Sequence, residues 1–333
     1  MIKALAAFEP RGKLRPFEYD PGELGHDEVE IDVHYCGICH SDVSVLDNEW
    51  GHTQYPVVAG HEIVGTISKV GAMVTKFKVD QVVGLGWNKG FCNECTPCNT
   101  GDKNLCRDAK KTILGNHGGF SEKVRAQANS VITIPEGIDL ESAGPLFCAG
   151  ISVFNPLVQF NIHPTHKVAV IGIGGLGHLA LQYFKAWGCE VTAFTSSEFK
   201  KQEALSLGAH HTIDSRDLSQ VENAKPEFDF ILSTVNVKLD WNAYISMLKP
   251  HGRLHFVGAT LDPIDINVFP MIMGQYTVSG SPGGSISTIA EMLEFTKRHN
   301  IKPTIEKYGF HEIDEAIDRV RSGDARYRVV LCR

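Results

Sequence analysis

The sequence predicts an α/β protein with an additional region of irregular β structure, and three observations lead to this fold class. Short β-type runs separated by Gly, Asn and Pro fill the first 148 residues. After Cys148, strands and helices alternate, which is typical of a parallel sheet covered by helices. A glycine-rich turn joins the first strand and the first helix of this second region, as in a doubly wound dinucleotide-binding domain.

Hydrophobic patterning places the individual elements along the chain. The first region is predicted to contain strands at residues 29–35, 63–70 and 131–134. The second region is predicted to contain a buried strand at 167–171, a helix at 175–187, a strand at 190–194, a helix at 199–206, and strands near 228–233 and 253–257. Beyond about Gly283, an amphipathic helix at 286–299 and a closing strand at 328–331 are expected.

Composition and charge limit the classes of function. With 333 residues, 43% of them hydrophobic and 21% charged, the chain is long enough for two packed cores of ordinary globular composition. Its formal net charge is -7, and it has no run of Lys or Arg. This charge pattern argues against a nucleic acid or an anionic membrane as the main partner. A diffusible small-molecule substrate fits better.

The sequence does not predict a secretory signal or a membrane-spanning segment. Its N-terminal apolar patch is broken by Glu9 and Pro10, so it lacks the apolar core of a secretory signal. The longest uncharged stretch, at 142–163, contains Pro145, Pro156 and two Asn, which is wrong for a membrane span. Nine cysteines in such a chain are more often thiols and metal ligands than disulfides. We therefore expect a cytoplasmic protein.

Four of the cysteines form a compact cluster on one loop. They have the spacing C-x2-C-x2-C-x7-C on a Gly-, Asn- and Pro-rich segment, at Cys92, Cys95, Cys98 and Cys106. This spacing predicts a closed zinc site with four sulfur ligands. An iron-sulfur cluster is the weaker alternative, because the last spacing is seven residues and no Pro follows Cys106.

The glycine-rich turn has the spacing G-x-G-x-x-G. Gly172, Gly174 and Gly177 carry the motif, with Gly175 and Leu176 between them, in the sequence VAVIGIGGLGH. Glycines at these positions allow a tight turn and a close approach of the backbone to a diphosphate, whose charge is stabilised by the N-terminus of the following helix. The alternative is an ordinary tight turn. The strand before the motif and the helix after it favour dinucleotide binding.

The residues at the end of the next strand favour NADP over NAD. Ser196, 19 residues after Gly177, stands where an NAD enzyme usually has an acidic residue. Hydroxyls and cations suited to a 2'-phosphate gather there, at Thr195, Ser196, Ser197, Lys200 and Lys201. In the alternative interpretation, the lysines are a solvated helix face and Glu198 holds the ribose of NAD.

Three further residues are candidates for a second, open metal site. Cys39, His61 and Cys148 together would leave zinc one coordination position for an oxygen. Such a metal polarises an alcohol or aldehyde oxygen, and a nicotinamide exchanges a hydride with the adjacent carbon. Taken singly, each residue is more often a core cysteine or a structural histidine. Cys36 and Cys39 also form C-x2-C, but no thioredoxin-like βαβ pattern surrounds this pair.

The motifs GICHSD, PVVAGHEIVG and GIGGLGH together resemble those of the zinc-dependent medium-chain alcohol dehydrogenases, in the cinnamyl alcohol dehydrogenase-like group. The resemblance runs over essentially the whole chain. It implies a GroES-like catalytic domain at 1–148, a Rossmann NADP-binding domain at 149–283, and a return to the catalytic domain at 284–333. It also implies two zinc ions per chain and a homodimer, with a tetramer as the alternative.

The same resemblance assigns roles to the metal-site residues. Cys39, His61 and Cys148 match the ligands of the catalytic zinc, and the four clustered cysteines match the structural zinc lobe. Asp42 matches a residue that hydrogen-bonds the ligand histidine. Glu62 matches an acid behind the metal that can displace a ligand transiently.

Residues around the metal are assigned in the same way. Ser41 matches the hydroxyl residue that contacts the substrate oxygen and begins a proton relay. The His that completes the relay in many members is replaced here by Ser44. His52 is either a substitute for it or a surface residue. His40 matches a residue that faces the cofactor diphosphate, although it could instead form a surface hydrogen bond. Trp50 and Trp87 match walls of the substrate pocket, and the alternative is that they only pack against the core.

Together these observations predict a zinc-dependent, NADP-linked oxidoreductase that interconverts primary alcohols and aldehydes by hydride transfer. One alternative within the enzymes is an NAD-dependent polyol or secondary-alcohol dehydrogenase. Another, outside them, is a noncatalytic NADP-binding module whose zinc ions are only structural.

Overall fold

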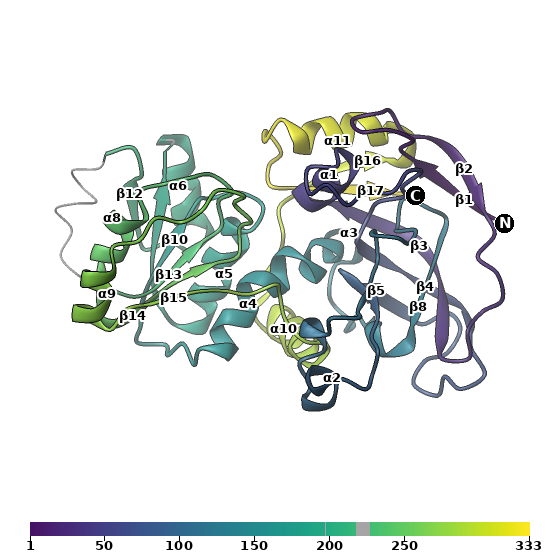
Figure 1. The fold of residues 1–333 in the computed structure, drawn as a ribbon, viewed down its shortest axis with the longest axis horizontal. Helices are drawn as coiled ribbons and strands as arrows, with labels where there is room; N and C mark the ends of the chain where they lie inside the picture. The colour runs from purple at the N-terminus through teal and green to yellow at the C-terminus, as the bar shows by residue number, and fades with distance from the viewer. Residues whose placement is uncertain (197, 218–226) are drawn as a thin grey trace. The chain divides into compact units, whose positions relative to one another are not determined.

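A computed structural model describes residues 1–196, 198–217 and 227–333 of the chain. The chain forms two compact units (Figure 1): unit 1 contains residues 1–151 and 284–333, and unit 2 contains residues 152–283. Ser197, which the sequence places among the cofactor-binding residues, lies outside the described residues. Within these described ranges, the helices are too short or too polar to cross a membrane.

Unit 1 is built around a seven-stranded sheet with the order β16-β17-β3-β4-β5-β9, in which β8 also pairs with β3. Its strands are β3 (Glu28–Ile38), β4 (Glu62–Val70), β5 (Val82–Leu85), β8 (Lys123–Gln127), β9 (Ile132–Thr133), β16 (Ile305–Gly309) and β17 (Arg328–Cys332). Two further strand pairs are β1 (Ile2–Ala6) with β2 (Arg15–Tyr19) and β6 (Asn88–Gly90) with β7 (Lys110–Lys111). Strand β17 pairs antiparallel with β3, so the C-terminal segment completes the sheet that the N-terminal region begins.

Short helices surround this sheet. They are α1 (His40–Leu46), α2 (Thr96–Thr100), α3 (Leu140–Ala143), α10 (Ile286–His299) and α11 (Ile313–Arg321). An ion pair ties α11 to the end of α1, because Arg321 Nη2 lies 2.9 Å from the buried Oδ1 of Asp47. Residues 286–299 had been predicted as a helix from their periodicity, and α10 has these bounds.

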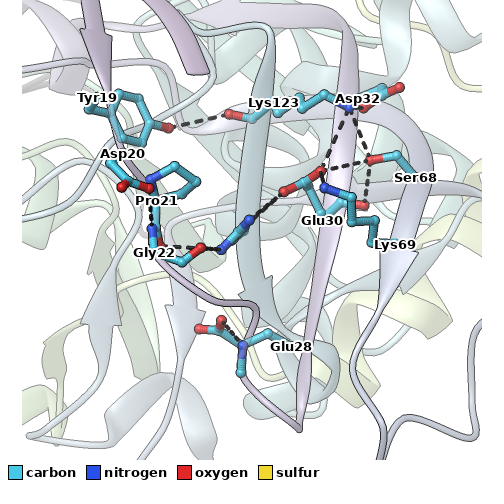
Figure 2. Close-up of polar contacts among 12 residues, drawn as sticks. Tyr19, Asp20, Pro21, Gly22, Glu28, Glu30, Asp32, Ser68, Lys69 and Lys123 are labelled. Carbon is cyan, nitrogen blue, oxygen red and sulfur yellow. Dashed lines mark hydrogen bonds and ion pairs between the residues drawn. The ribbon is translucent and has the colours of Figure 1, made fainter. Parts of the chain in front are cut away.

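A charged cluster joins three strands of unit 1 (Figure 2). Glu30 of β3 is buried, with Arg125 Nε of β8 2.8 Å from its Oε2 and Lys69 Nζ of β4 3.1 Å from its Oε1. Arg125 also donates through Nη1 to the carbonyl oxygen of Gly22, at 2.8 Å. The cluster therefore holds the segment between β2 and β3 against the sheet.

The described part of unit 2 contains a six-stranded parallel sheet with the order β12-β11-β10-β13-β14-β15. The strands are β10 (Lys167–Ile171), β11 (Glu190–Thr195), β12 (His211–Asp214), β13 (Phe228–Ser233), β14 (Leu248–Phe256) and β15 (Thr277–Gly280). Counted from β10, this is the doubly wound order 3-2-1-4-5-6, whose switch point lies between β10 and β13. The predicted fold class is confirmed.

Helices cover both faces of this sheet (Figure 1): α4 (Ala149–Gln159), α5 (Gly177–Trp187), α6 (Glu198–Leu207), α8 (Trp241–Ser246) and α9 (Val268–Gly274). Phe184 of α5 contacts Phe230 of β13, with ring centroids 6.0 Å apart. Tyr244 of α8 contacts Phe194 of β11 at 5.3 Å. Helix α5 begins two residues later than the sequence predicted, because Gly175 and Leu176 belong to the turn.

Candidate active site

The fold brings together three residues that lie far apart in the sequence. Cys39 caps the N-terminus of α1, His61 directly precedes β4, and Cys148 directly precedes α4. Cys39 Sγ lies 3.5 Å from His61 Nε2 and 3.9 Å from Cys148 Sγ. One ligand atom from each of these residues, and one from Glu62, lie within 4.8 Å of one another. The group can therefore hold one metal ion.

Asp42 fixes the geometry of two of these residues. Its Oδ1 accepts a hydrogen bond from His61 Nδ1 at 2.9 Å and one from the backbone N–H of Gly60 at 2.8 Å. Its Oδ2 accepts from the backbone N–H of Cys39 at 3.0 Å. Because His61 donates through Nδ1, its Nε2 is left as the metal-facing nitrogen. Asp42 is fully buried, so these bonds are shielded from water.

The charges in this group suit a cationic ligand. The hydrogen bond from Cys148, reinforced by His61, holds the pKa of the Cys39 thiol well below its usual range. Burial alone would lower the pKa of His61, but the negative charges of Asp42 and Cys39 outweigh burial and raise it well above its ordinary value. The thiolate is the form of cysteine that binds metals. Zinc needs a neutral imidazole, so its binding would release a proton from His61.

Glu62 lies at the base of the group and pairs with a distant arginine. Arg328 of β17 donates to Oε1 of Glu62, and both side chains are buried. Among the described residues, Oε2 of Glu62 and Nε of Arg328 are buried without a hydrogen-bond partner. Burial raises the pKa of Glu62, although the charge of Arg328 opposes that shift. The sequence predicted Glu62 as a site residue but did not identify Arg328, which no spacing rule connects to it.

Two tryptophans adjoin the metal-site group. The ring of Trp87 stands 5.0 Å from that of His61, at an interplanar angle of 90°. Trp50 meets Trp87 edge to face at 6.1 Å. Both are half-buried, and each packs against the core of unit 1. The structure thus places both predicted pocket residues beside the group.

The polar residues of α1 and its flanking loop differ in exposure. The backbone N–H of Ser41 donates to Cys39 Sγ at 3.3 Å, which places Ser41 directly beside the metal-site group. Ser44, at the position of the expected relay histidine, is buried and donates to Glu49 Oε2 at 2.7 Å. His40 is exposed, with Nε2 3.9 Å from Glu49 Oε2. His52 is exposed on the loop that follows α1.

The four clustered cysteines also converge. Their sulfur atoms lie within 4.8 Å of one another, with Cys98 and Cys106 buried and Cys92 and Cys95 half-buried. Backbone N–H groups of Glu94 and Cys95 lower the pKa of Cys92 to about 6. Four sulfurs in one compact group match the closed coordination of a structural zinc ion.

The glycine turn in unit 2 has the shape of a diphosphate cradle. Gly172 has φ +85°, and a Cβ there would lie 2.4 Å from Val235 Cγ1. A Cβ on Gly177 would lie 2.0 Å from the carbonyl oxygen of Gly172. By contrast, a Cβ on Gly174 would meet nothing within 4 Å. Gly172 and Gly177 are therefore required by packing, whereas Gly174 leaves open space where a ligand can approach the backbone.

The residues predicted to contact the cofactor ribose lie at the end of β11. Thr195 is its last residue and is buried, and the exposed Ser196 follows it. Glu198, the alternative ribose ligand, pairs with Lys201, whose Nζ lies 2.8 Å from its Oε2. Lys200 lies in the first turn of α6. The cations therefore gather on this helix, and the carboxylate of Glu198 is engaged by one of them.

Comparison with known proteins agrees with both parts of this description. The alcohol dehydrogenase GroES-like domain family matches residues 25–136, and the zinc-binding dehydrogenase family matches residues 175–298. Aldehyde reductase AdhA of Synechocystis is 58% identical over 99% of this chain and 98% of its own length. The chain belongs to the zinc-dependent medium-chain alcohol dehydrogenases. It falls in their cinnamyl alcohol dehydrogenase-like group.

Other members of this dehydrogenase family resemble the chain over nearly their whole length. Vomilenine reductase of Rauvolfia serpentina is 39% identical over 98% of this chain and 93% of its own length. The structure of a cinnamyl alcohol dehydrogenase from Sorghum bicolor has a TM-score of 0.95 at 36% identity, covering 99% of this chain and 97% of that one. A cinnamyl alcohol dehydrogenase from Helicobacter pylori, complexed with NADP(H), has a TM-score of 0.91 at 34% identity, with the same coverage. Membership makes this chain an enzyme, an alcohol dehydrogenase or aldehyde reductase, rather than a noncatalytic module.

Proposed function

We propose that the protein is a zinc-dependent, NADP-linked oxidoreductase that interconverts primary alcohols and aldehydes. The observation that carries this proposal is the convergence of Cys39, His61 and Cys148 in a protein that also has a dinucleotide cradle at Gly172–Gly177. When bound, zinc polarises the oxygen of an alcohol or aldehyde, and NADP exchanges the hydride with its carbon. The name of the 58% identical relative, an aldehyde reductase, supports this substrate class.

We assign the residues of unit 1 the following parts. Cys39, His61 and Cys148 hold the zinc ion, and Asp42 keeps His61 in the tautomer that presents Nε2. Trp50 and Trp87 form an apolar wall of the substrate pocket. The four-cysteine group binds a second, structural zinc ion.

We assign the proton transfer to Ser41. Its position beside Cys39 is the reason, since a hydroxyl there can donate to or accept from the substrate oxygen. The carboxylate of Glu49 accepts the hydrogen bond from Ser44 and can receive a proton at the position where the relay histidine is missing. His40, exposed at the start of α1, remains our candidate contact to the cofactor diphosphate.

For the cofactor we propose NADP held by the 172–177 turn, with Thr195, Ser196, Ser197 and Lys200 at its ribose 2'-phosphate. The hydroxyl residues Thr195 and Ser196 at the end of β11, followed by Lys200 on α6, support NADP, because hydroxyls and a lysine ammonium can bind a phosphate. The NADP(H) complex of the 34% identical relative points in the same direction. An NAD-dependent enzyme would be expected to present a free acid there.

The decisive experiment measures NADPH oxidation with a panel of aldehydes, before and after zinc removal by a chelator. We expect aldehyde-dependent turnover that is faster with NADPH than with NADH and is restored by added zinc. Full activity in the zinc-free protein would contradict the metal assignment. Equal or faster turnover with NADH would contradict the cofactor assignment alone.

We further propose a homodimer formed through unit 2. Strand β15 is an edge of the described sheet (Figure 1). Helix α9, which precedes β15 in the sequence, exposes a row of apolar side chains. Val268, Phe269, Ile272 and Met273 on α9 are 67%, 73%, 66% and 70% exposed. Such an apolar patch beside an unpaired edge is typical of a subunit interface. Light scattering should give twice the 36.6 kDa chain mass, and Phe269→Lys with Ile272→Lys should give the monomer.

We also propose a cytoplasmic location. All nine cysteines are free in the structure, which is typical of a reducing compartment. Thiolates that ligate zinc require the same condition. Fractionation of cells producing the full chain tests this, and recovery with exported proteins would contradict it.

A further inference from the structure

The carbonyl oxygens of the glycine turn are held by hydrogen bonds, and one donor comes from a different strand. Thr234 directly follows β13, and its Oγ1 lies 2.8 Å from the carbonyl oxygen of Gly172 and 3.0 Å from that of Ile171. The backbone N–H of Thr234 also donates to the carbonyl of Ile171, at 3.0 Å. The hydroxyl has one proton to donate, and its shorter contact is with the carbonyl of Gly172.

Two further carbonyls of the turn are held from within the same strand-turn-helix segment. That of Leu176 accepts from the backbone N–H groups of Leu179 at 3.1 Å and Ala180 at 3.0 Å. The carbonyl oxygen of Gly174 accepts from the backbone N–H of His178 and from its ring Nδ1, both at 3.1 Å. Thr234 therefore differs from His178, because it connects the turn to the neighbouring strand across the switch point of the sheet. Val235 reinforces this connection by filling the space next to Gly172.

The N–H groups of the turn, in contrast, are left for a ligand. Within the described ranges, the backbone N–H groups of Gly174, Gly175 and Leu176 donate to no protein acceptor. These groups lie at the N-terminus of α5, where an anion is favoured. A peptide unit is planar, with its C=O and N–H on opposite sides. The carbonyl of Gly172 shares its peptide unit with the N–H of Ile173, and the carbonyl of Gly174 shares one with the N–H of Gly175. Fixing these two carbonyls therefore fixes the direction of those two N–H groups.

We propose that Thr234 is a positioning residue for NADP. Its hydroxyl anchors the carbonyl of Gly172 and thereby orients the N–H of Ile173, at the point where the chain enters the turn that faces the cofactor diphosphate. This inference rests on the proposed function, because it assumes that the turn binds NADP. Without the hydroxyl, the turn would have to be ordered when the cofactor binds, which weakens binding.

The test compares Thr234→Val, which removes the hydroxyl and keeps the shape, with Thr234→Ser, which keeps the hydroxyl. NADPH binding to the full chain is measured by the change in cofactor fluorescence, together with kcat and KM for NADPH. We expect the Kd of Thr234→Val to rise about fivefold to tenfold, the usual effect of one lost hydrogen bond. Thr234→Ser should stay within about twofold of the unmodified protein, and KM should change more than kcat.

Thermal melting of the cofactor-free variants shows whether a change in NADPH affinity comes from positioning of the turn or from a loss of overall stability. Thr234→Ala, which also lacks the hydroxyl but adds no methyl next to Gly177, serves as a second variant if Thr234→Val does not fold. Unchanged NADPH affinity in the hydroxyl-free variants, or equal weakening in Thr234→Ser, would overturn the inference. If the unmodified protein bound no NADPH, the proposed function itself would be wrong. That result is distinguished from failure of the Thr234 inference because it needs no variant.

Discussion

The two groups of metal-ligating side chains in unit 1 are built differently. The cysteines at 92, 95, 98 and 106 share one loop, whereas Cys39, His61 and Cys148 come from three separate segments. The first group offers four sulfurs, and the second offers three ligands with an ion-paired Glu62 behind them. A metal in the first group is enclosed by protein ligands, and a metal in the second keeps a position for substrate. Loss of metal should therefore affect stability in one case and chemistry in the other.

The largest effect is expected for Cys148→Ser. Loss of a zinc ligand removes the polarising metal, which contributes several kcal/mol, so kcat/KM should fall at least about a thousandfold. NADPH binding in unit 2 should persist, and metal analysis should show about one zinc ion lost. The matched control is Cys36→Ala, since Cys36 is buried near Cys39 but outside the ligand group. Retained zinc and activity in Cys148→Ser would exclude Cys148 as a ligand.

The opposite pattern is expected for Cys98→Ser in the four-cysteine group. A zinc ion bound there would close a loop that has only a small core of its own, so its loss should lower the free energy of unfolding by roughly 3 kcal/mol. Denaturation by urea with zinc present measures this change. At temperatures where the variant stays folded, kcat should remain within about threefold of the unmodified protein. A collapse of kcat with unchanged stability would reverse the roles of the two groups.

The same contrast explains what could be predicted from the sequence. The four cysteines were recognisable because local spacing alone brings ligands on one loop together. Sequence spacing does not connect Cys39, His61 and Cys148. They are identified as a ligand set by the motifs around them, which resemble those of a known family. Arg328 and Glu62, 266 positions apart, pair because β17 joins the sheet beside β3, which no local pattern reports. Thr234 was missed for a similar reason, since its hydroxyl acts on a neighbouring strand.

In unit 2 the sequence was more informative, because a buried parallel strand is a short apolar run with few alternatives. Strands β10 and β13 have the bounds that periodicity predicted. The short helices α8 and α9 were not predicted, since six or seven residues carry too little periodicity to be recognised. The dinucleotide turn was recognisable because its close backbone contacts require glycine. At Gly177, for example, a Cβ would collide with the carbonyl oxygen of Gly172.

A smaller effect is expected for Asp42→Asn, which tests whether Asp42 orients His61 in the open site. The amide keeps the size of Asp42 but loses the charge that stabilises the N–H of His61. Zinc affinity should fall about 10- to 100-fold, as for other residues that orient a metal ligand. Competition with a chromophoric chelator measures this change. The four-cysteine group should be unaffected, so a loss that affected both zinc ions equally would contradict a local role for Asp42.

The smallest effect is a pH dependence of stability at the cluster of Glu30, Lys69 and Arg125, which contains no cysteine or histidine and contrasts with both metal-site groups (Figure 2). Burial opposes ionisation of Glu30, but hydrogen bonds from Lys69 and Arg125 outweigh burial and lower its pKa below the ordinary value. A carboxyl whose pKa is lower in the folded state adds stability above its unfolded pKa and loses it as the pH falls through the folded pKa. Stability should therefore decline below about pH 5.

Glu30→Gln removes the titrating group and should flatten this decline while leaving the zinc content unchanged at pH 7. Urea unfolding of both proteins between pH 7 and pH 4 gives the comparison, with bound zinc measured at each pH. The difference between the two curves of unfolding free energy against pH gives the contribution of Glu30 alone, because proton uptake that accompanies metal release is common to both proteins. Parallel curves would show that Lys69 and Arg125 stabilise the strands without favouring the ionised carboxylate, because only a shifted pKa couples this cluster to pH.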